Sequence, residues 1–351
     1  MTPPSAEHGW ARRDVIVVGA SAGGVESLVS FVRALPRDLP AAVLVVLHLP
    51  PSGASALPEI LARAGELPVH FASGADDLRP GRVLLAPPDR HLLVIKEQLR
   101  VSRGPRENGH RPAVDVLFRS AARSLGPRVV AVVLSGALDD GTSGALVVEQ
   151  EGGAVLVQKP TEAAYPSMPE SVLARVASAT AGSVVELAAT ADRLSRTPVP
   201  VYQLDHGAVS MSLEAELEEL VTQAEEHQGP SAGFECPDCH GSMFDIGDGQ
   251  LPRLRCRVGH AWSSAGLLLQ QSEAMEGALW MAWRSLEERA ALSRDLAERA
   301  VERGSTLSAS RFLEQAREAS HSAGLVRKLI ETGSSGAPVE AVGHPSVAGD
   351  G

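Results

Sequence analysis

The stretch Val15–Gly24, which reads VIVVGASAGG, decides the fold of this 351-residue chain. Four β-branched residues in a row predict a buried strand, and the glycine-rich turn after them predicts the start of a helix. Such a turn places the hydroxyl of Ser21 at the carboxyl end of a strand. The free N–H groups and the positive dipole end of the following helix favour a developing anion there. The stretch therefore indicates a site for acyl chemistry or for binding a phosphate.

The chain repeats this alternation of short apolar runs and helical segments up to about residue 195. The rhythm predicts an α/β fold, a doubly wound and mainly parallel sheet with helices on both faces. Two runs around Lys96–Gln98 predict a hairpin inserted into that sheet. We expect strands at Val15–Gly19, Ala42–Leu47, Val83–Ala86, Val129–Leu134 and Ala154–Val157, and helices near Val25–Arg33, Ser55–Ala64, Pro112–Ser124, Thr142–Gln150 and Pro169–Val176.

Composition shifts divide the chain further. Prolines and a polar Gly/Ser stretch mark a linker after the α/β part, and the last residues are rich in Gly, Ser and Pro. The expected parts are a disordered N-terminus (1–13), a catalytic domain (14–196), a linker with an acidic helix at Met211–His227 (197–233), a zinc-ribbon-like unit (234–262), a helical segment (263–333) and a disordered tail (334–351).

The charge and hydropathy of the chain exclude several classes of protein. A net charge of -11 argues against a protein that coats nucleic acid. No apolar run reaches the roughly 18 residues that a membrane span needs, and Met1–Arg13 contains no apolar segment of a signal peptide. We therefore expect a cytoplasmic protein without membrane insertion.

Two further residues at strand ends are candidate partners for the Ser21 hydroxyl. The second predicted strand ends in His48, where a dinucleotide-binding fold would carry an acidic residue, and Asp139 and Asp140 follow a later strand. Because carboxyl ends of parallel strands meet at one edge, Ser21, His48 and Asp140 predict a nucleophile, a base and an orienting carboxylate. A backbone-capped histidine and a helix-capping aspartate are the alternatives. The chain order also differs from the Ser–Asp–His order of α/β-hydrolases.

Six motifs accompany these residues: Gly19–Gly24 (GASAGG), His48–Pro50 (HLP), Ala86–His91 (APPDRH), Arg111–Asp115 (RPAVD), Gly136–Gly141 (GALDDG) and Met168-Pro169. With them, the segment from about Asp14 to Thr190 resembles the catalytic domain of chemotaxis-type protein-glutamate methylesterases, the CheB family. The resemblance implies that Ser21, His48 and Asp140 hydrolyse γ-glutamyl methyl esters of a methylated receptor, releasing methanol without a catalytic cofactor. It also implies deamidation of certain receptor glutamines.

Three departures from the family pattern bear on activity. Ala22 stands where the family usually has threonine, and Ala137-Leu138 stands where it usually has Met-Gly. About a dozen residues precede the first strand, so we expect no fused receiver domain. The substitutions at Ala22, Ala137 and Leu138 keep one alternative open, a degenerate esterase domain that acts as a regulatory or scaffolding module and binds partners through the zinc unit and the helices. A hydrolase of small esters that uses the same three residues of the predicted triad is another alternative.

Other residues of these motifs allow a structural reading as well as a functional one. His91 and Arg111 either line the cleft or hold loops. Asp115 is interpreted as solvated surface. Met168 lies near the site by family position or fills the core.

All three cysteines lie between positions 236 and 256, and a histidine follows them at 260. The pattern Cys236-x2-Cys239, then Cys256-x3-His260, predicts a closed tetrahedral site for structural zinc. His240 is a rival ligand that would strain the geometry. Similar ribbons follow the esterase domain in some relatives.

The helical segment carries Trp280, Trp283 and several leucines at helical spacing. It predicts an intramolecular hairpin or a surface that docks a cognate methyltransferase or another signalling protein, and we favour the hairpin.

Overall fold

The computed structural model describes residues 9–51, 55–74, 76–201, 230–247 and 252–333. The chain forms two compact units, Met1–Leu267 and Leu268–Gly351. The predicted acidic helix at Met211–His227 and the predicted disordered tail lie outside the described residues.

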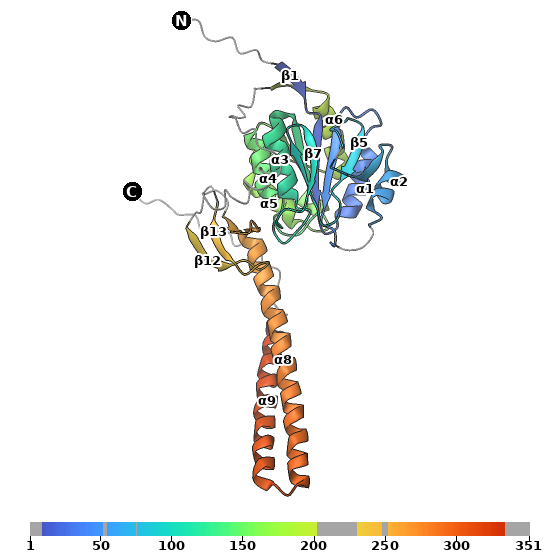
Figure 1. Ribbon diagram of the computed structural model, residues 1–351. Helices are drawn as coiled ribbons and strands as arrows, with labels where there is room; N and C mark the ends of the chain where they lie inside the picture. Colours follow the sequence, from blue (N-terminus) through green and yellow to red (C-terminus); the bar gives the residue numbers. More distant parts are fainter. Residues whose placement is uncertain (1–8, 52–54, 75, 202–229, 248–251, 334–351) are drawn as a thin grey trace, which may run out of the picture. The chain divides into compact units, whose positions relative to one another are not determined.

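A sheet of seven parallel strands forms the centre of the first unit (Figure 1), in the order β10-β9-β8-β2-β3-β5-β4. The central strands are buried on both faces, as expected when helices cover a parallel sheet on both sides. The predicted doubly wound α/β fold is confirmed. The strands are β2 (Val15–Ala20), β3 (Ala42–Leu47), β4 (Val69–Phe71), β5 (Arg82–Leu85), β8 (Val129–Val133), β9 (Ala154–Gln158) and β10 (Thr180–Gly182).

Six helices cover the sheet, three on each face. Alternate residues of β2 point to opposite faces, so Val17 contributes to one core cluster and Val18 to the other. The Val17 cluster includes residues of α3, α4 and α5, and the Val18 cluster includes residues of α1, α2 and α6. The helices are α1 (Gly24–Ala34), α2 (Leu57–Ala64), α3 (Val114–Leu125), α4 (Thr142–Gln150), α5 (Ser167–Arg175) and α6 (Val184–Ser195), with 3-10 turns η1 (Gly126–Arg128) and η2 (Pro160–Glu162).

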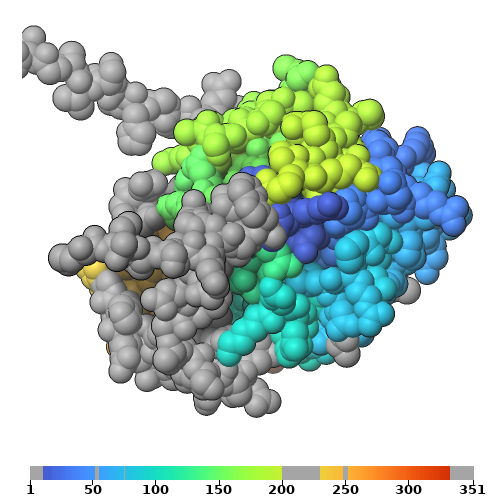
Figure 2. Space-filling model, turned by 90° about the horizontal axis from the view of Figure 1, so that it is seen from above, coloured from blue at the N-terminus to red at the C-terminus, as the bar shows by residue number. Residues whose placement is uncertain are grey.

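Several elements differ from the sequence-based expectation. Residues 9–12, predicted to be disordered, form β1 (Gly9–Arg12), which pairs antiparallel with β11 (Pro198–Val201) in the predicted linker. Figure 2 shows these two distant segments side by side, in dark blue and yellow-green. The hairpin β6 (His91–Ile95) and β7 (Gln98–Ser102) forms a separate two-stranded sheet instead of entering the main one. Pairing between distant segments leaves little trace in local sequence.

The cysteine-bearing part folds as a four-stranded antiparallel sheet within the first unit, which we call the ribbon. Its small core contains Met243, Leu254 and Trp262 together with Cys236 and Cys256. Its strands are β12 (Ser231–Glu235), β13 (Ser242–Asp245), β14 (Arg253–Cys256) and β15 (Ala261–Ser263).

Two long helices, α8 (Ser264–Glu302) and α9 (Thr306–Gly333), make up the described part of the second unit, except that the first four residues of α8 belong to the first unit. They run side by side as the predicted hairpin (Figure 1). Small buried residues recur along both helices, which allows the helices to pack closely. Among the described residues, no helix is apolar over a length that could cross a membrane. The buried small residues are Ala290, Ser293, Ala297, Ala300, Ala309, Ala316, Ala319 and Ala323.

Helix α3 packs directly on β2 through a glycine. A Cβ atom at Gly19 would lie 2.2 Å from Cγ1 of Val114, the first residue of α3. Any side chain at position 19 would therefore displace the Val114 side chain from its place on the sheet.

We expect Gly19→Ala to lower the free energy of unfolding by roughly 1–3 kcal/mol, because the added methyl overpacks this contact. Chemical denaturation followed by circular dichroism measures the change. Gly277→Ala is the control, because position 277 is helical with no atom within 4 Å of an added Cβ. Adding Val114→Ala should recover part of the loss, and strictly additive effects of the two substitutions would contradict the assigned contact.

Candidate active site

The sequence-predicted catalytic residues lie at the carboxyl ends of three adjacent strands. Ser21 follows β2, His48 follows β3, and Asp140 lies in the turn between β8 and α4. Strand β3, the next strand of this sheet after β2 in the chain, pairs with one side of β2, and the later strand β8 pairs with the other side. The strand order therefore reverses at β2. Open α/β sheets bind ligands at such a switch in strand order.

The three side chains form one hydrogen-bonded line. Ser21 Oγ lies 2.9 Å from His48 Nδ1, and His48 Nε2 lies 2.7 Å from Asp140 Oδ2. A carboxylate accepts, so Nε2 carries the proton and Nδ1 accepts from the serine hydroxyl. The two ring nitrogens exchange the roles they have in the serine proteases, while the logic of nucleophile, base and orienting carboxylate is kept.

The N-terminus of α3 holds the Asp140 carboxylate. Val114 N–H donates to Oδ2 (2.7 Å), and Asp115 N–H donates to Oδ1 (3.1 Å). Burial opposes ionisation of Asp140, but the hydrogen bond and charge of His48 and the Val114 N–H outweigh it, so the pKa of Asp140 is lowered. Asp140 therefore remains an anion facing His48, while its neighbour Asp139 accepts a hydrogen bond from Ser263 Oγ (2.8 Å).

Ser135 fixes the nucleophile turn from the neighbouring strand end. Its carbonyl accepts from Ser21 N–H (3.0 Å), and its hydroxyl donates to the Ala22 carbonyl (2.8 Å). Gly136 lies so close that an added Cβ would be 2.0 Å from Met168 Sδ and 3.0 Å from Ser21 Cβ. Met168 is thus a buried neighbour of the Ser21 site, and the turn leaves room only for glycine at position 136.

Position 138, where the related pattern has glycine, adopts a glycine-like backbone. Leu138 has a φ of 64°, a left-handed conformation that costs energy for a leucine. Its N–H donates to Ser167 Oγ (2.9 Å), which helps to hold the turn. Leucine at position 138 therefore adopts the same turn that the family pattern forms with glycine.

The structure assigns structural positions to the other motif residues. His91 is buried, donates from Nε2 to the Pro105 carbonyl and accepts at Nδ1 from Ala113 N–H. The interpretation of Asp115 as solvated surface is wrong: it is buried, and its Oδ1 accepts from Gly141 and Gly144 N–H at the start of α4. A carboxylate at a helix N-terminus far along the chain has no local sequence signal.

Arg111 holds the loop before α3. It pairs with Asp89 (2.7 Å) and donates to the carbonyls of Arg103 and Gly104, and Arg103 contacts the same carboxylate. These two guanidinium groups lower the pKa of Asp89 to about 2.

His110, which is not among the residues predicted from the sequence, lies in the same loop and stacks on His48. The ring centroids are 3.7 Å apart, and the planes differ by 13°. Burial, reinforced by His48, lowers the pKa of His110 to about 4, so this ring is neutral at pH 7. The one sequence feature that could have indicated His110 is its position directly before the Arg111–Asp115 motif.

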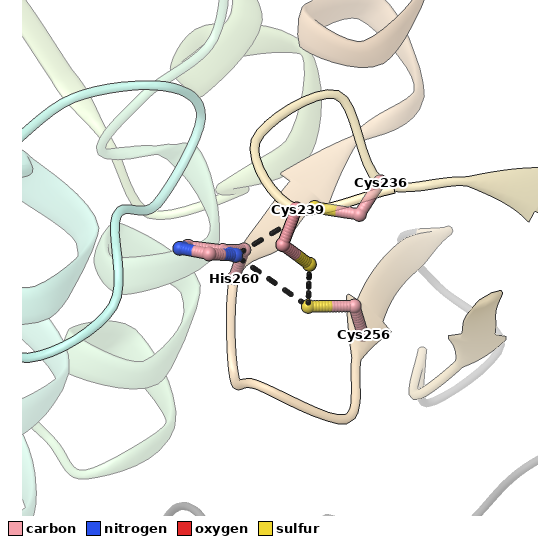
Figure 3. Close-up of side chains that lie close together, drawn as sticks. All are labelled: Cys236, Cys239, Cys256 and His260. Atoms are coloured by element: carbon pink, nitrogen blue, oxygen red, sulfur yellow. Dashed lines mark hydrogen bonds between the residues drawn. The ribbon is translucent and has the colours of Figure 1, made fainter. Parts of the chain in front are cut away.

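The ribbon brings Cys236, Cys239, Cys256 and His260 together, with all four ligand atoms within 4.8 Å of one another (Figure 3). His260 Nδ1 lies 3.7 Å from Cys236 Sγ and 3.6 Å from Cys256 Sγ, and Cys239 Sγ lies 3.5 Å from Cys256 Sγ. Ligand atoms about 3.5–3.8 Å apart surround a tetrahedral zinc ion with Zn–S bonds near 2.3 Å. The donor set fits zinc, and the rival ligand His240 is exposed and outside the cluster.

The region that holds these residues is similar to a known protein family. The family profile described as CheB methylesterase matches residues 16–194, just over half of the chain. The chain belongs to the CheB methylesterase family. The match covers the sheet and the complete Ser21–His48–Asp140 line and ends before the ribbon.

Curated relatives carry the name protein-glutamate methylesterase/protein-glutamine glutaminase. One from Methanosarcina mazei is 36% identical over 171 residues (46% of this chain and 47% of the relative). One from Xanthomonas campestris is 39% identical over 184 residues (51% and 50%). The chain thus spans about half the length of the curated relatives it matches. The crystal structure of the Thermotoga maritima CheB methylesterase catalytic domain is 31% identical, with a TM-score of 0.49, covering 52% of this chain and 98% of that one.

Because its pKa is lowered, Asp89 should make the free energy of unfolding depend on pH in the acidic range. Its folded pKa of about 2 lies below the ordinary value of 3.8, so its contribution is complete above the ordinary value and is lost as the pH falls through 2. We expect stability to fall less steeply from about pH 4 to pH 2 in Asp89→Asn, which tolerates the positive φ of 55° at this position. Urea denaturation across this range measures the slope, and equal slopes would contradict the assignment.

Proposed function

We propose that this chain hydrolyses γ-glutamyl methyl esters on a methyl-accepting chemotaxis-type receptor and releases methanol. The observation that carries the proposal is the line from Ser21 through His48 to Asp140 inside the region that matches the family. The same acyl transfer would release ammonia from certain receptor glutamines.

The first step is attack by Ser21 Oγ on the ester carbonyl while His48 Nδ1 takes the hydroxyl proton. Asp140, already hydrogen-bonded to Nε2–H, stabilises the imidazolium that forms. The tetrahedral intermediate collapses, the bond to the methoxy group breaks, and Nδ1–H protonates the departing methoxide, which leaves as methanol.

The second step hydrolyses the acyl-enzyme. Water attacks the Ser21 ester while His48 Nδ1 accepts a proton, and collapse frees the glutamate and returns the proton to Ser21 Oγ. We assign the Ala22 N–H, directly after the nucleophile at the approach to α1, as a backbone donor to the oxyanion in both steps. A backbone donor survives the replacement of threonine by alanine at this position.

Ser21→Ala should abolish methanol release, with a loss of roughly 10⁴-fold or more, because no nucleophile remains. The assay incubates the full chain with a radiolabelled, methylated receptor from the same host and measures volatile methanol. Circular dichroism of the variant shows whether the fold is intact.

Two matched variants sharpen this test. His48→Gln and Asp140→Asn should each lose activity while remaining folded, whereas His240→Ala, on the exposed ribbon surface, should keep it. Retained activity in Ser21→Ala would contradict the proposal. An inactive but folded wild-type chain would favour the alternative of a regulatory scaffold, and activity on small esters alone would favour a small-ester hydrolase.

We further propose that Cys236, Cys239, Cys256 and His260 hold one structural zinc ion. Two observations support this proposal. The donor set suits zinc, and the apolar core of the ribbon contains too few residues to stabilise its fold alone. A zinc ion held by these four ligands would have no open coordination position, so it would stabilise the ribbon and take no part in the ester chemistry.

The purified chain should contain one zinc per molecule, measured by elemental mass spectrometry after gel filtration. Cys239→Ser should lose most of it, because one of four ligands is weakened, and His240→Ala should retain it. Equal zinc content in both variants, or none in the wild type purified without chelators, would contradict this site.

A further inference from the structure

The ribbon is joined to the loop that carries His110. Strand β15 lies at the edge of the ribbon sheet, and residues 106–108 pair along it. Asn108 N–H donates to the Ala261 carbonyl (2.8 Å), and Ala261 N–H donates to the Arg106 carbonyl (3.2 Å). Ser263 N–H donates to Asn108 Oδ1 (2.7 Å). The loop thus continues the ribbon sheet by main-chain hydrogen bonds.

A buried ion cluster reinforces this junction. Glu107, only 5% exposed, forms two hydrogen bonds with Arg119 of α3 (2.8 and 2.6 Å) and also accepts from Arg253 of β14. Burial opposes ionisation of Glu107, but the two guanidinium groups outweigh it and hold its pKa well below the ordinary value. Loss of either arginine would leave a buried charge without full compensation.

A tight turn transmits this anchoring to His110. Glu107 N–H donates to the His110 carbonyl (3.1 Å), and His110 N–H donates to the Glu107 carbonyl (2.9 Å). Asn108 and Gly109 between them have φ values of 52° and 75°, the Asn-Gly pattern of a type I′ turn. With both ends bonded and its side anchored on β15, the turn has little freedom to move the His110 ring.

His110 is placed to act on the charged form of the base. During acyl transfer His48 becomes an imidazolium, and the face of a neutral aromatic ring attracts a cation above it. Asp140 raises the pKa of His110 and Arg106 lowers it, but burial has a larger effect than either. A neutral ring at this place stabilises the imidazolium and keeps its plane aligned with Ser21 and Asp140.

We propose that His110 is a positioning residue for His48 and that the ribbon, through Asn108 and Glu107, holds it in place. The role rests on the proposed function in that it acts on the same base. It makes the ribbon part of the esterase machinery, although none of its residues belongs to the Ser21–His48–Asp140 line.

The test compares His110→Phe, which keeps a flat aromatic face, with His110→Leu, which keeps bulk without one. Two readouts are used: methanol release from the methylated receptor, and the rate at which a fluorophosphonate labels Ser21. In labelling, the Oγ–P bond forms, the P–F bond breaks, fluoride leaves and His48 takes the serine proton. We expect His110→Leu to lose roughly tenfold in kcat and in labelling rate with KM unchanged, and His110→Phe to lose at most about threefold.

The contribution of the ribbon is tested at Asn108. Asn108→Gly keeps the positive φ but removes the oxygen that Ser263 N–H contacts, whereas Asn108→Asp retains an oxygen acceptor. We expect Asn108→Gly to slow Ser21 labelling severalfold in the wild type and to have no further effect in His110→Leu, because it acts through His110.

Each of the following results would contradict one part of the proposal. Wild-type rates in His110→Leu, or equal losses in the Leu and Phe variants, would remove the role of the aromatic face. Additive losses in the double variant would show that the ribbon acts elsewhere. His110-dependent labelling without methanol release would contradict the proposed function and leave this inference intact.

Discussion

The candidate site depends on one buried carboxylate. Asp140 accepts from the backbone of α3 on one side and faces Nε2 of His48 on the other. Without the helix N-terminus the charge would be costly to bury, and without the charge the imidazole would have no fixed tautomer. Gly19 of β2 leaves room for the Val114 side chain at the start of α3, whose N–H groups bind the carboxylate.

The residues around this carboxylate are held in place by contacts with elements that are distant in the sequence. Ser135 holds the Ser21 turn, Asp115 caps the helix that follows Asp140, and the loop before α3 carries His110 onto His48. The ribbon extends this arrangement by binding that loop. A second module within the same compact unit therefore contributes to the surroundings of the base.

Local sequence was sufficient where the physical signal is local. The β-branched runs gave β3 with its observed bounds, the helix Thr142–Gln150 was predicted as it stands, and the strand-end rule brought together Ser21, His48 and Asp140. Cysteine spacing likewise predicted the cluster around His260. The pairing of β1 with β11, the cap by Asp115 and the stacking of His110 all join residues far apart in the chain. Their cause is tertiary packing, which periodicity and motif spacing do not encode.

The tautomer of His48 tests this account most directly. Nitrogen-15 NMR of the folded chain, with the ring nitrogens assigned by comparison with His48→Gln, reports which nitrogen carries the proton at neutral pH. We expect a proton on Nε2, hydrogen-bonded to Asp140, and an unprotonated Nδ1 facing Ser21. A proton on Nδ1 would contradict it, because His48 could not then accept the serine proton.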